Sequence, residues 1–283
     1  MQELHPQWKW LIGFLFVTIL TAGCASENLI RPGDTLDVAY KKALKQYRSE
    51  NYRDAANAFE TVINTGRGTD YARSAYFFAA ESYYASEQYL LAADAFRQYV
   101  ALYPRSPKRI DAAFKEALSY YKTSPRYKID QKYTRKSIEQ FRLFLSQYPD
   151  SERSEEAAKY LTEMRSKLAE KNYHSAKLYM RTDQYKAAVI FYDLTIDQFP
   201  ETKWAEKALV EEIAAYVEYA NESVQDRQGE RFEKAVESYE KYLQLFPNGE
   251  NRQRAETLVD QARAALTDLS PVTEDTQTSS ADQ

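Results

Sequence analysis

The sequence predicts an all-α protein, an α-solenoid of five helix pairs closed by one C-terminal helix. The prediction rests on a scarcity of helix breakers, on an aromatic column that recurs at helical spacing, and on prolines at one fixed distance behind that column. The 283 residues include only 7 Gly and 9 Pro, whereas average usage would supply about 20 and about 14. A chain this poor in breakers and this rich in helix formers is expected to be helical throughout.

The aromatic column defines a repeat, and its five anchors are Phe59, Phe96, Phe141, Tyr192 and Tyr239. A small residue stands four positions before each anchor, and proline stands eight positions after four of the five. The small residue and the anchor therefore share one helix face, where the small residue lets a neighbouring helix approach. Proline then ends the helix, because it lacks an N–H and restricts the residue before it. The residues expected to cap the helices that follow are Ser106, Ser151 and Thr202.

The partner helices repeat as well, every 37 residues in the first three units. Their columns are Tyr40, Phe77 and Phe114, then Ala43, Ala80 and Ala117, then Tyr47, Tyr84 and Tyr121. The predicted pairs are 34–49 with 52–65, 70–86 with 89–103, 107–122 with 134–148, 152–182 with 185–199, and 203–221 with 230–246, followed by a capping helix at 251–267. Because Glu152–Gln184 contains neither Gly nor Pro, it predicts one helix of about 30 residues, ~45 Å long.

This pattern resembles the TPR repeat. The anchor spacings of 37, 45, 51 and 47 residues exceed the TPR period of about 34. The excess predicts insertions at 122–132, at 221–230 and within the long helix.

The N-terminus predicts export and lipidation. Lys9 precedes the apolar stretch Trp10–Leu20, which has the length of a signal-peptide core. The sequence from Leu20 to Cys24 (LTAGC) resembles the lipobox of bacterial lipoproteins, with Thr21 where Leu is usual. Cys24 is the only cysteine, so no intramolecular disulfide competes for it. The alternatives are an ordinary signal peptide followed by a free thiol, or a buried core cysteine.

Four segments follow from these patterns. Residues 1–23 are expected to be removed as a signal peptide, and residues 24–33 to form a lipidated linker. Residues 34–267 form the repeat array, and residues 268–283 a disordered tail rich in Ser, Thr and Asp. Ala25, the residue after the cysteine, favours the outer membrane.

The charge balance and the missing motifs exclude several function classes. Lys and Arg (38) nearly balance Asp and Glu (42), for a net charge of −4, so nucleic acid is not an expected partner. No phosphate-binding loop, nucleophile elbow or zinc-protease motif occurs. His174 has no second histidine or cysteine near it, and adjacent carboxylates such as Glu211 and Glu212 are expected on solvated helix faces. We therefore expect no enzyme activity, no metal and no cofactor.

A lipobox followed by five TPR-like units with one long fused helix resembles the BamD family, over about residues 24–267. The segments most similar to it are Ala92–Phe96 with the Tyr103-Pro104 stop, and Phe141–Ser151. The resemblance implies an outer-membrane lipoprotein, anchored on the periplasmic face, that acts as a scaffold subunit of the β-barrel assembly (BAM) complex. It implies two partners, the POTRA region of a BamA-like barrel protein and the C-terminal signals of unfolded outer-membrane proteins. The alternative is a pilotin-like or cell-division-coordinating periplasmic TPR lipoprotein.

One stripe of side chains is the candidate peptide-binding site. If the alanine column is the small packing position of each first helix, the residues three before and four after it face a concave groove. The resulting aromatic stripe is Tyr40, Tyr47, Phe77, Tyr84, Phe114 and Tyr121. Such rings offer large contact area with few torsions to freeze, and Arg73 is the expected partner of a terminal carboxylate. The alternative is that the stripe is core.

Overall fold

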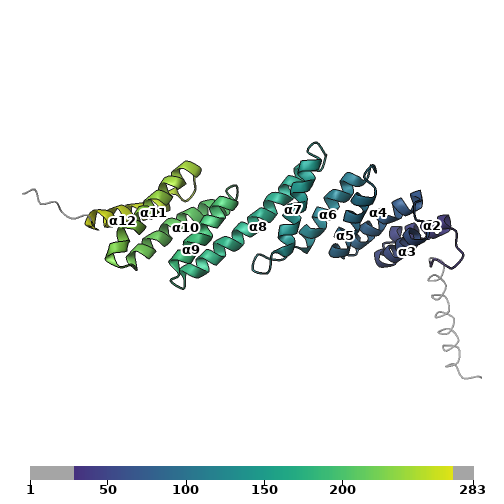
Figure 1. Ribbon diagram of the computed structural model, residues 1–283, viewed down its shortest axis with the longest axis horizontal. Coiled ribbons are helices and arrows are strands. Elements are labelled where there is room, and N and C mark those ends of the chain that lie inside the picture. The colour runs from purple at the N-terminus through teal and green to yellow at the C-terminus, as the bar shows by residue number, and fades with distance from the viewer. Residues whose placement is uncertain (1–28, 270–283) are drawn as a thin grey trace, which may run out of the picture. The chain divides into compact units, whose positions relative to one another are not determined.

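The computed structural model describes residues 29–269, and every regular element in that range is an α-helix. Ten helices form five successive pairs, and an eleventh closes the chain (Figure 1). The pairs are α2 (Leu36–Arg48) with α3 (Tyr52–Thr65), α4 (Asp70–Ala85) with α5 (Tyr89–Leu102), α6 (Arg109–Thr123) with α7 (Lys132–Gln147), α8 (Ser154–Met180) with α9 (Tyr185–Gln198), and α10 (Lys203–Asn221) with α11 (Gln225–Leu245); α12 (Arg252–Leu269) follows. The predicted all-α array of five TPR-like pairs with a capping helix is confirmed.

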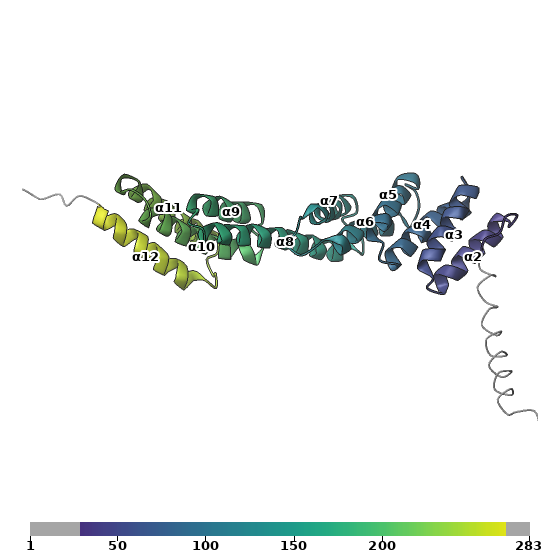
Figure 2. The ribbon, with the colours of Figure 1, turned by 90° about the horizontal axis from the view of Figure 1, so that it is seen from below.

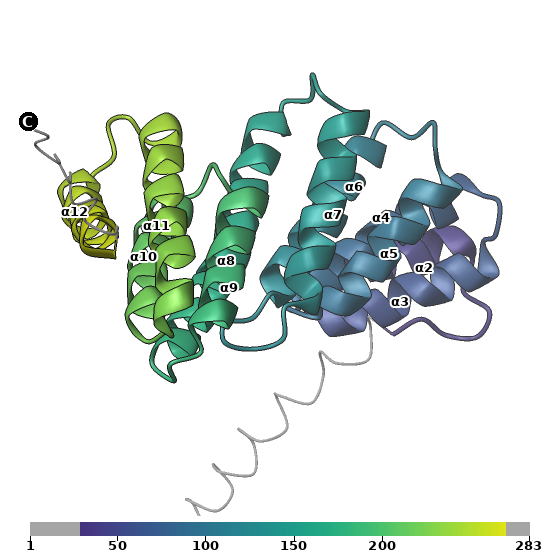
Figure 3. The ribbon, with the colours of Figure 1, turned by 60° about the vertical axis from the view of Figure 1, so that its left-hand side comes forward.

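The helices group into two compact units. Unit 1 holds residues up to 124 together with 139–157, and unit 2 holds 125–138 together with residues from 158 onward. Within unit 1, α2 to α6 lie side by side in chain order (Figures 1 and 2). Within unit 2, α9 to α12 do the same, and α12 packs against both α11 and α10 (Figure 3).

The prolines end helices as the sequence predicts. The helices α5, α7, α9 and α11 each end two residues before a proline, at Leu102, Gln147, Gln198 and Leu245. The residue before each proline therefore lies outside the helix, because the proline ring disfavours α geometry at that position.

Two of the three predicted N-caps are wrong, and Thr202 is confirmed in position only. Ser106 and Ser151 lie before the first turn, where their hydroxyls accept from the N–H groups of Lys108 and Arg153, both at 3.2 Å. Thr202 does occupy the N-cap position of α10, but its hydroxyl donates to the Phe199 carbonyl at 2.9 Å instead of accepting from the helix. In each case the side-chain hydroxyl bonds within the turn that follows the proline. That bond competes with capping of the next helix for the same hydroxyl oxygen.

The anchor residues form the core of each pair. Phe59, Phe96, Phe141 and Tyr192 are fully buried, and Tyr239 is 7% exposed. The small residues four positions earlier are equally buried, which is the close helix approach that the column predicts. The assignment of the anchors to the core is confirmed.

A polar network joins α10 to the turn between α11 and α12. The Glu206 carboxylate on α10 accepts from the Tyr242 hydroxyl at 3.1 Å, from the Asn251 backbone N–H at 2.9 Å and from the Asn251 side chain at 3.1 Å. Bonds to an ionised acceptor are stronger than neutral ones. They position the turn between α11 and α12, where Gly249 lies against the Tyr242 ring.

Two boundaries differ from the prediction. The segment 221–230 is not a loop, because α11 already begins at Gln225 and includes Gly229. One glycine costs a helix only about 1 kcal/mol, which neighbouring helix formers offset. The long helix α8 has 27 residues, slightly fewer than expected, because a turn around Asp183, whose φ is 55°, separates it from α9.

Candidate functional site

None of the helices in the described range 29–269 is long and apolar enough to cross a bilayer. The same residues contain no cluster of three or more His, Cys, Asp or Glu side chains suited to a metal ion. Cys24, the predicted lipidation site, lies outside the described residues.

The aromatic stripe divides into core and half-buried residues. Phe77 is 6% exposed and Phe114 is 1% exposed. Their rings pack edge-on against the anchors, Phe77 against Phe96 at 6.1 Å between centroids and Phe114 against Phe141 at 6.0 Å. Both side chains are too buried to line an open groove, which corrects their expected position. Phe77 and Phe114, which stand three residues before the alanine column, point toward the second helix of their pair and not toward a groove.

The four tyrosines of the stripe remain half-buried: Tyr40, Tyr47, Tyr84 and Tyr121. Tyr40 lies against Tyr71 at 5.4 Å, and Tyr47 packs between Tyr52 at 5.5 Å and Phe78 at 5.3 Å. These rings support the core while keeping part of each surface accessible. Peptide binding by the four residues, which we call the tyrosine set, stays a prediction.

Arg73 lies on the first turn of α4 and is exposed. Its guanidinium forms an ion pair with Asp70 at 3.0 Å, one turn earlier on the same helix. An exposed pair of this kind is weak, about 0–1 kcal/mol. A ligand carboxylate could therefore displace Asp70, and the expected role of Arg73 stays a prediction.

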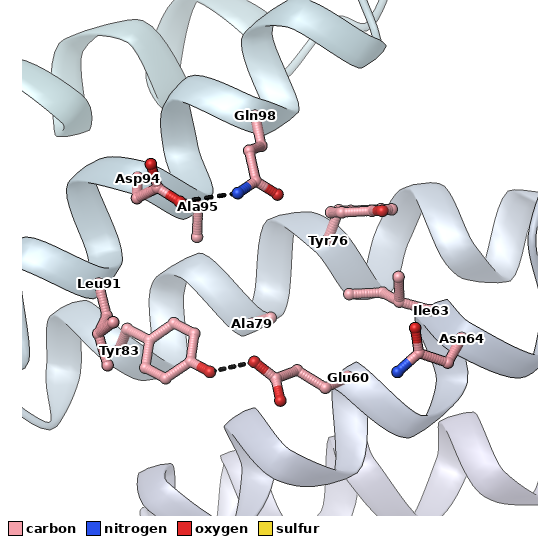
Figure 4. A pocket seen from close by; sticks show the side chains of 10 residues that line it. All are labelled: Glu60, Ile63, Asn64, Tyr76, Ala79, Tyr83, Leu91, Asp94, Ala95 and Gln98. Atoms are coloured by element: carbon pink, nitrogen blue, oxygen red, sulfur yellow. Dashed lines mark hydrogen bonds between the residues drawn. The ribbon is translucent and has the colours of Figure 1, made fainter.

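Unit 1 has a cavity of about 340 Å³ between α3, α4 and α5, which we call the acidic cavity. Figure 4 shows its two hydrogen bonds: the Tyr83 hydroxyl donates to Glu60, and the Gln98 amide donates to Asp94 at 2.7 Å. Burial, and then the bond to Glu60, raises the pKa of Tyr83 above its usual value, so the phenol stays a neutral donor. Glu60 and Asp94 are the charged residues of its lining.

A second cavity of unit 1, of about 380 Å³, lies between α5, α6 and α7, and we call it the arginine cavity. Its walls are mainly apolar, with Val100, Leu143 and Phe144, and its lining includes Arg97 and Arg109. The Arg109 Nε is buried and makes no hydrogen bond among the described residues.

Unit 2 has a cavity of about 570 Å³ between α9, α10 and α11, which we call the basic cavity. Its lining combines four cations with two carboxylates and two tyrosines: Lys186, Arg227, Arg231, Lys234, Asp193, Glu230, Tyr216 and Tyr219. The Arg231 guanidinium stacks on the Tyr219 ring at 3.7 Å. Ile190, which also lines the cavity, is 51% exposed. This cavity offers an accessible surface that is both cationic and apolar.

Glu212 on α10 is a buried carboxyl group that interacts with Asp193, a half-buried residue of the basic cavity's lining. Glu212 is 3% exposed, and its Oε1 accepts from the Ser238 hydroxyl at 2.8 Å. Burial, and then the charge of Asp193, raises the pKa of Glu212 to about 8. Burial also raises the pKa of Asp193, against the opposing effect of Lys241 at 3.7 Å. The raised pKa favours the protonated form of Glu212 at neutral pH.

Glu211 and Glu212 were expected on a solvated helix face, and this expectation is wrong. Their exposed fractions are 8% and 3%. Glu211 is neutralised by Arg254 at 2.6 Å and Lys177 at 3.5 Å, both far from it in sequence. The burial of Glu211 and Glu212 could have been predicted from their position within the apolar run of α10, from Ala208 to Ala220. His174 is half-buried and stacks on Tyr127 at 4.8 Å between ring centroids, as a packed residue would.

Among solved structures, the chain is similar to the TPR2AB domain of yeast Sti1 in its complex with pHSP90. The identity is 15% and the TM-score 0.37, with 82% of this chain and 100% of that chain covered. It is also similar to the Rap protein complexed with competence and sporulation factor. That identity is 14% and the TM-score 0.33, with 95% and 78% covered.

Among curated proteins, the chain is similar to outer membrane protein assembly factor BamD of Rickettsia prowazekii, at 22% identity over 213 residues. The match covers 74% of this chain and 84% of the relative. A putative BamD of Aquifex aeolicus is 25% identical over 256 residues, with 83% of each chain covered. Residues 33–232 match the model of the YfiO family, described as outer membrane lipoprotein. The chain therefore belongs to the YfiO family of outer membrane lipoproteins, the BamD family that its lipobox and repeats resemble.

Proposed function

We propose that the protein is a scaffold subunit of the outer-membrane β-barrel assembly complex. The observation that carries the proposal is the family match over residues 33–232, together with two relatives named as the assembly factor BamD. The helical array supports a binding role, because stacked repeats build extended surfaces from units that contact only their neighbours. A scaffold needs such surfaces and no reactive centre.

The proposed anchor is a lipid on Cys24, which would hold the array at the periplasmic face of the outer membrane. Several acyl chains, each contributing about 0.8 kcal/mol per buried CH₂, give stable attachment. Wild-type protein should incorporate labelled palmitate and fractionate with outer membranes, and Cys24→Ala should do neither. Equal labelling of the two proteins would rule out this anchor.

The proposed contact with the barrel protein is the basic cavity of unit 2. Its four cations suit an acidic periplasmic POTRA surface, and its exposed Ile190 supplies an apolar contact. Charged surfaces of this kind mainly set partner choice and association rate. The family resemblance implies the POTRA region as the partner, and the cavity is where this chain best fits it.

The test is charge reversal in the full chain. Lys186 and Lys234 are exposed residues of the cavity lining, so Lys186→Glu/Lys234→Glu should weaken binding of the purified POTRA region by tenfold or more. Arg181→Glu/Lys207→Glu is the matched control, since it changes the net charge equally and both residues are exposed and outside the lining. Equal loss of affinity in both variants would show that net charge matters and the cavity does not.

The second proposed partner is the C-terminal signal of an unfolded outer-membrane protein, bound by unit 1. The expected contacts are the tyrosine set with Arg73. A fluorescent peptide of a barrel C-terminus should bind the wild-type chain and bind Tyr47→Ala/Tyr84→Ala more weakly. Tyr83→Ala removes a ring of the acidic cavity and serves as the control. Unchanged affinity in a folded double variant, checked by circular dichroism, would exclude the tyrosine set as the client site.

A further inference from the structure

The acidic and arginine cavities occupy equivalent places in successive repeats. A shift of 37 residues maps the α3 and α4 lining of the first onto the α5 and α6 lining of the second. By that shift Glu60 corresponds to Arg97, Ile63 to Val100, Asn64 to Ala101, Tyr76 to Ala113, and Ala79 to Glu116. All ten residues line their respective cavities. The fold therefore builds the same depression twice, and only the side chains distinguish the two.

The side chains reverse the charge between the two cavities. The acidic cavity presents Glu60 and Asp94 (Figure 4), whereas the arginine cavity presents Arg97 and Arg109. Arg109 corresponds to Ala72, a buried small residue of the earlier repeat. The second guanidinium is thus an addition to the repeat and not a requirement of its packing.

Arg109 is left without an anion. Its side chain is half-buried, its Nε is buried without a hydrogen bond, and its guanidinium carbon lies 5.7 Å from the Tyr148 ring centroid. In the described part of the chain no carboxylate lies within ion-pair distance of it. The nearest acidic residue on its own helix, Asp111, is paired with Arg153 at 3.3 Å. A half-buried guanidinium without a carboxylate partner can form a charge-assisted hydrogen bond with an anion, so the site favours anion binding.

One carboxylate, Glu116, also lines the arginine cavity. It is 6% exposed and already has an interaction partner. It lies two turns from Arg109 along α6, about 10 Å away at 1.5 Å per residue. The Arg109 end of the cavity is consequently its cationic end, and it is the end where the helix N-terminus also favours negative charge.

We propose that the arginine cavity docks an extended, otherwise apolar segment of a partner protein that carries one acidic side chain, held by Arg109. This goes beyond the proposed contacts with the POTRA region and with client C-termini. It assigns a third interaction surface, on α5, α6 and α7 of unit 1.

The apolar lining of the arginine cavity favours a polypeptide ligand over a small anion. Val100, Phe144 and the half-exposed Leu143 add apolar surface to the lining that holds Arg109, and a free anion would not use that surface. A segment with apolar residues flanking an acidic one covers Leu143 while its carboxylate reaches the guanidinium fork. The equivalent acidic cavity has the opposite charge and should reject the same segment. The two cavities would then select different partner segments by their charge.

The experiment is a double-mutant cycle between the full chain and a labelled peptide, acetyl-Ala-Leu-Glu-Leu-Ala-amide, read by fluorescence anisotropy. Replacing the peptide Glu with Gln should weaken binding to wild type about tenfold, the usual effect of losing a charge-assisted bond. In Arg109→Gln, the Glu and Gln peptides should bind equally. Because Arg109 is half-buried and the variant breaks no ion pair within the described residues, its thermal melting should stay close to that of wild type.

Arg105→Gln is the matched control, since Arg105 is exposed, four residues away and outside the lining. It should retain the full preference for the Glu peptide. Wild type that binds neither peptide, or binds both alike, would overturn the proposal without any variant being needed. Stronger, Arg109-dependent binding of acetyl-Ala-Leu-Gln-Leu-Ala with a free C-terminal carboxylate would overturn it too, by making the ligand a chain terminus.

Discussion

The five aromatic anchors show how one residue type at one position organises a helix pair. Each ring fills the space beside a small residue four positions earlier, and four of the five are fully buried. Phe59 also stacks on Phe78 of the next helix pair at 5.6 Å. The anchor therefore contributes both to its own pair and to the contact with its neighbour.

Replacing one anchor should be costly. Phe96→Ala leaves a cavity in a fully buried site, so we expect a loss of about 3–5 kcal/mol in the free energy of unfolding. Chemical denaturation followed by circular dichroism measures it. The control is Leu91→Ala, because Leu91 is 51% exposed on the same helix and should lose under about 1 kcal/mol. A loss for Phe96→Ala as small as that of Leu91→Ala would contradict the core assignment.

The Glu212–Asp193 pair makes stability depend on pH. An acid whose pKa is raised in the folded state takes up a proton on folding, so its stabilisation is complete below the unfolded pKa. That stabilisation is lost as the pH rises toward the folded pKa of about 8. The free energy of unfolding should therefore fall between about pH 5 and pH 8.

Glu212→Gln removes the titrating group while keeping a hydrogen-bonding side chain. We expect a smaller fall in stability over that pH range and a variant more stable than wild type at pH 8. Urea denaturation at a series of pH values provides the comparison, with the exposed Glu218→Gln as the control. Parallel curves for wild type and Glu212→Gln would show that Glu212 does not take up a proton on folding.

At the scale of the helices, local rules predicted some boundaries and failed at others. The prolines set the ends of α5, α7, α9 and α11 because their effect is covalent and confined to adjacent residues. The second helix of the fifth pair was predicted to start at residue 230, whereas α11 begins at Gln225 and includes Gly229. A glycine costs a helix little when the surrounding residues favour helix, and here they do.

Two glycines of unit 2 should respond in opposite ways to the same substitution. A Cβ on Gly249 would lie closer than van der Waals contact to the Tyr242 ring, while one on Gly229 would meet nothing within 4 Å. Gly249→Ala should therefore cost about 1–3 kcal/mol through overpacking. Gly229→Ala, inside α11, should gain about 0.5–1 kcal/mol. Thermal melting gives both signs, and a stabilised Gly249→Ala would refute the described packing of α12.

At the scale of the whole molecule, the sequence predicted the array far better than its binding surfaces. Repeat columns report burial, so they located the core of each pair from Phe59 to Tyr239. Cavities depend on residues from three helices at once, as with Arg97, Arg109 and Leu143. The same limit explains Phe77 and Phe114, whose periodicity placed them on the first helix without showing which neighbour they would contact.

The central claim is that this lipoprotein acts as a scaffold in outer-membrane barrel assembly. The most direct measurement is purification of the tagged full chain from detergent-solubilised outer membranes, with its stable partners identified by mass spectrometry. The account predicts an outer-membrane barrel protein with periplasmic POTRA domains, in near-stoichiometric amount and lost in Lys186→Glu/Lys234→Glu. Recovery of the chain alone, or with pilus or cell-division components in place of that barrel protein, would contradict it.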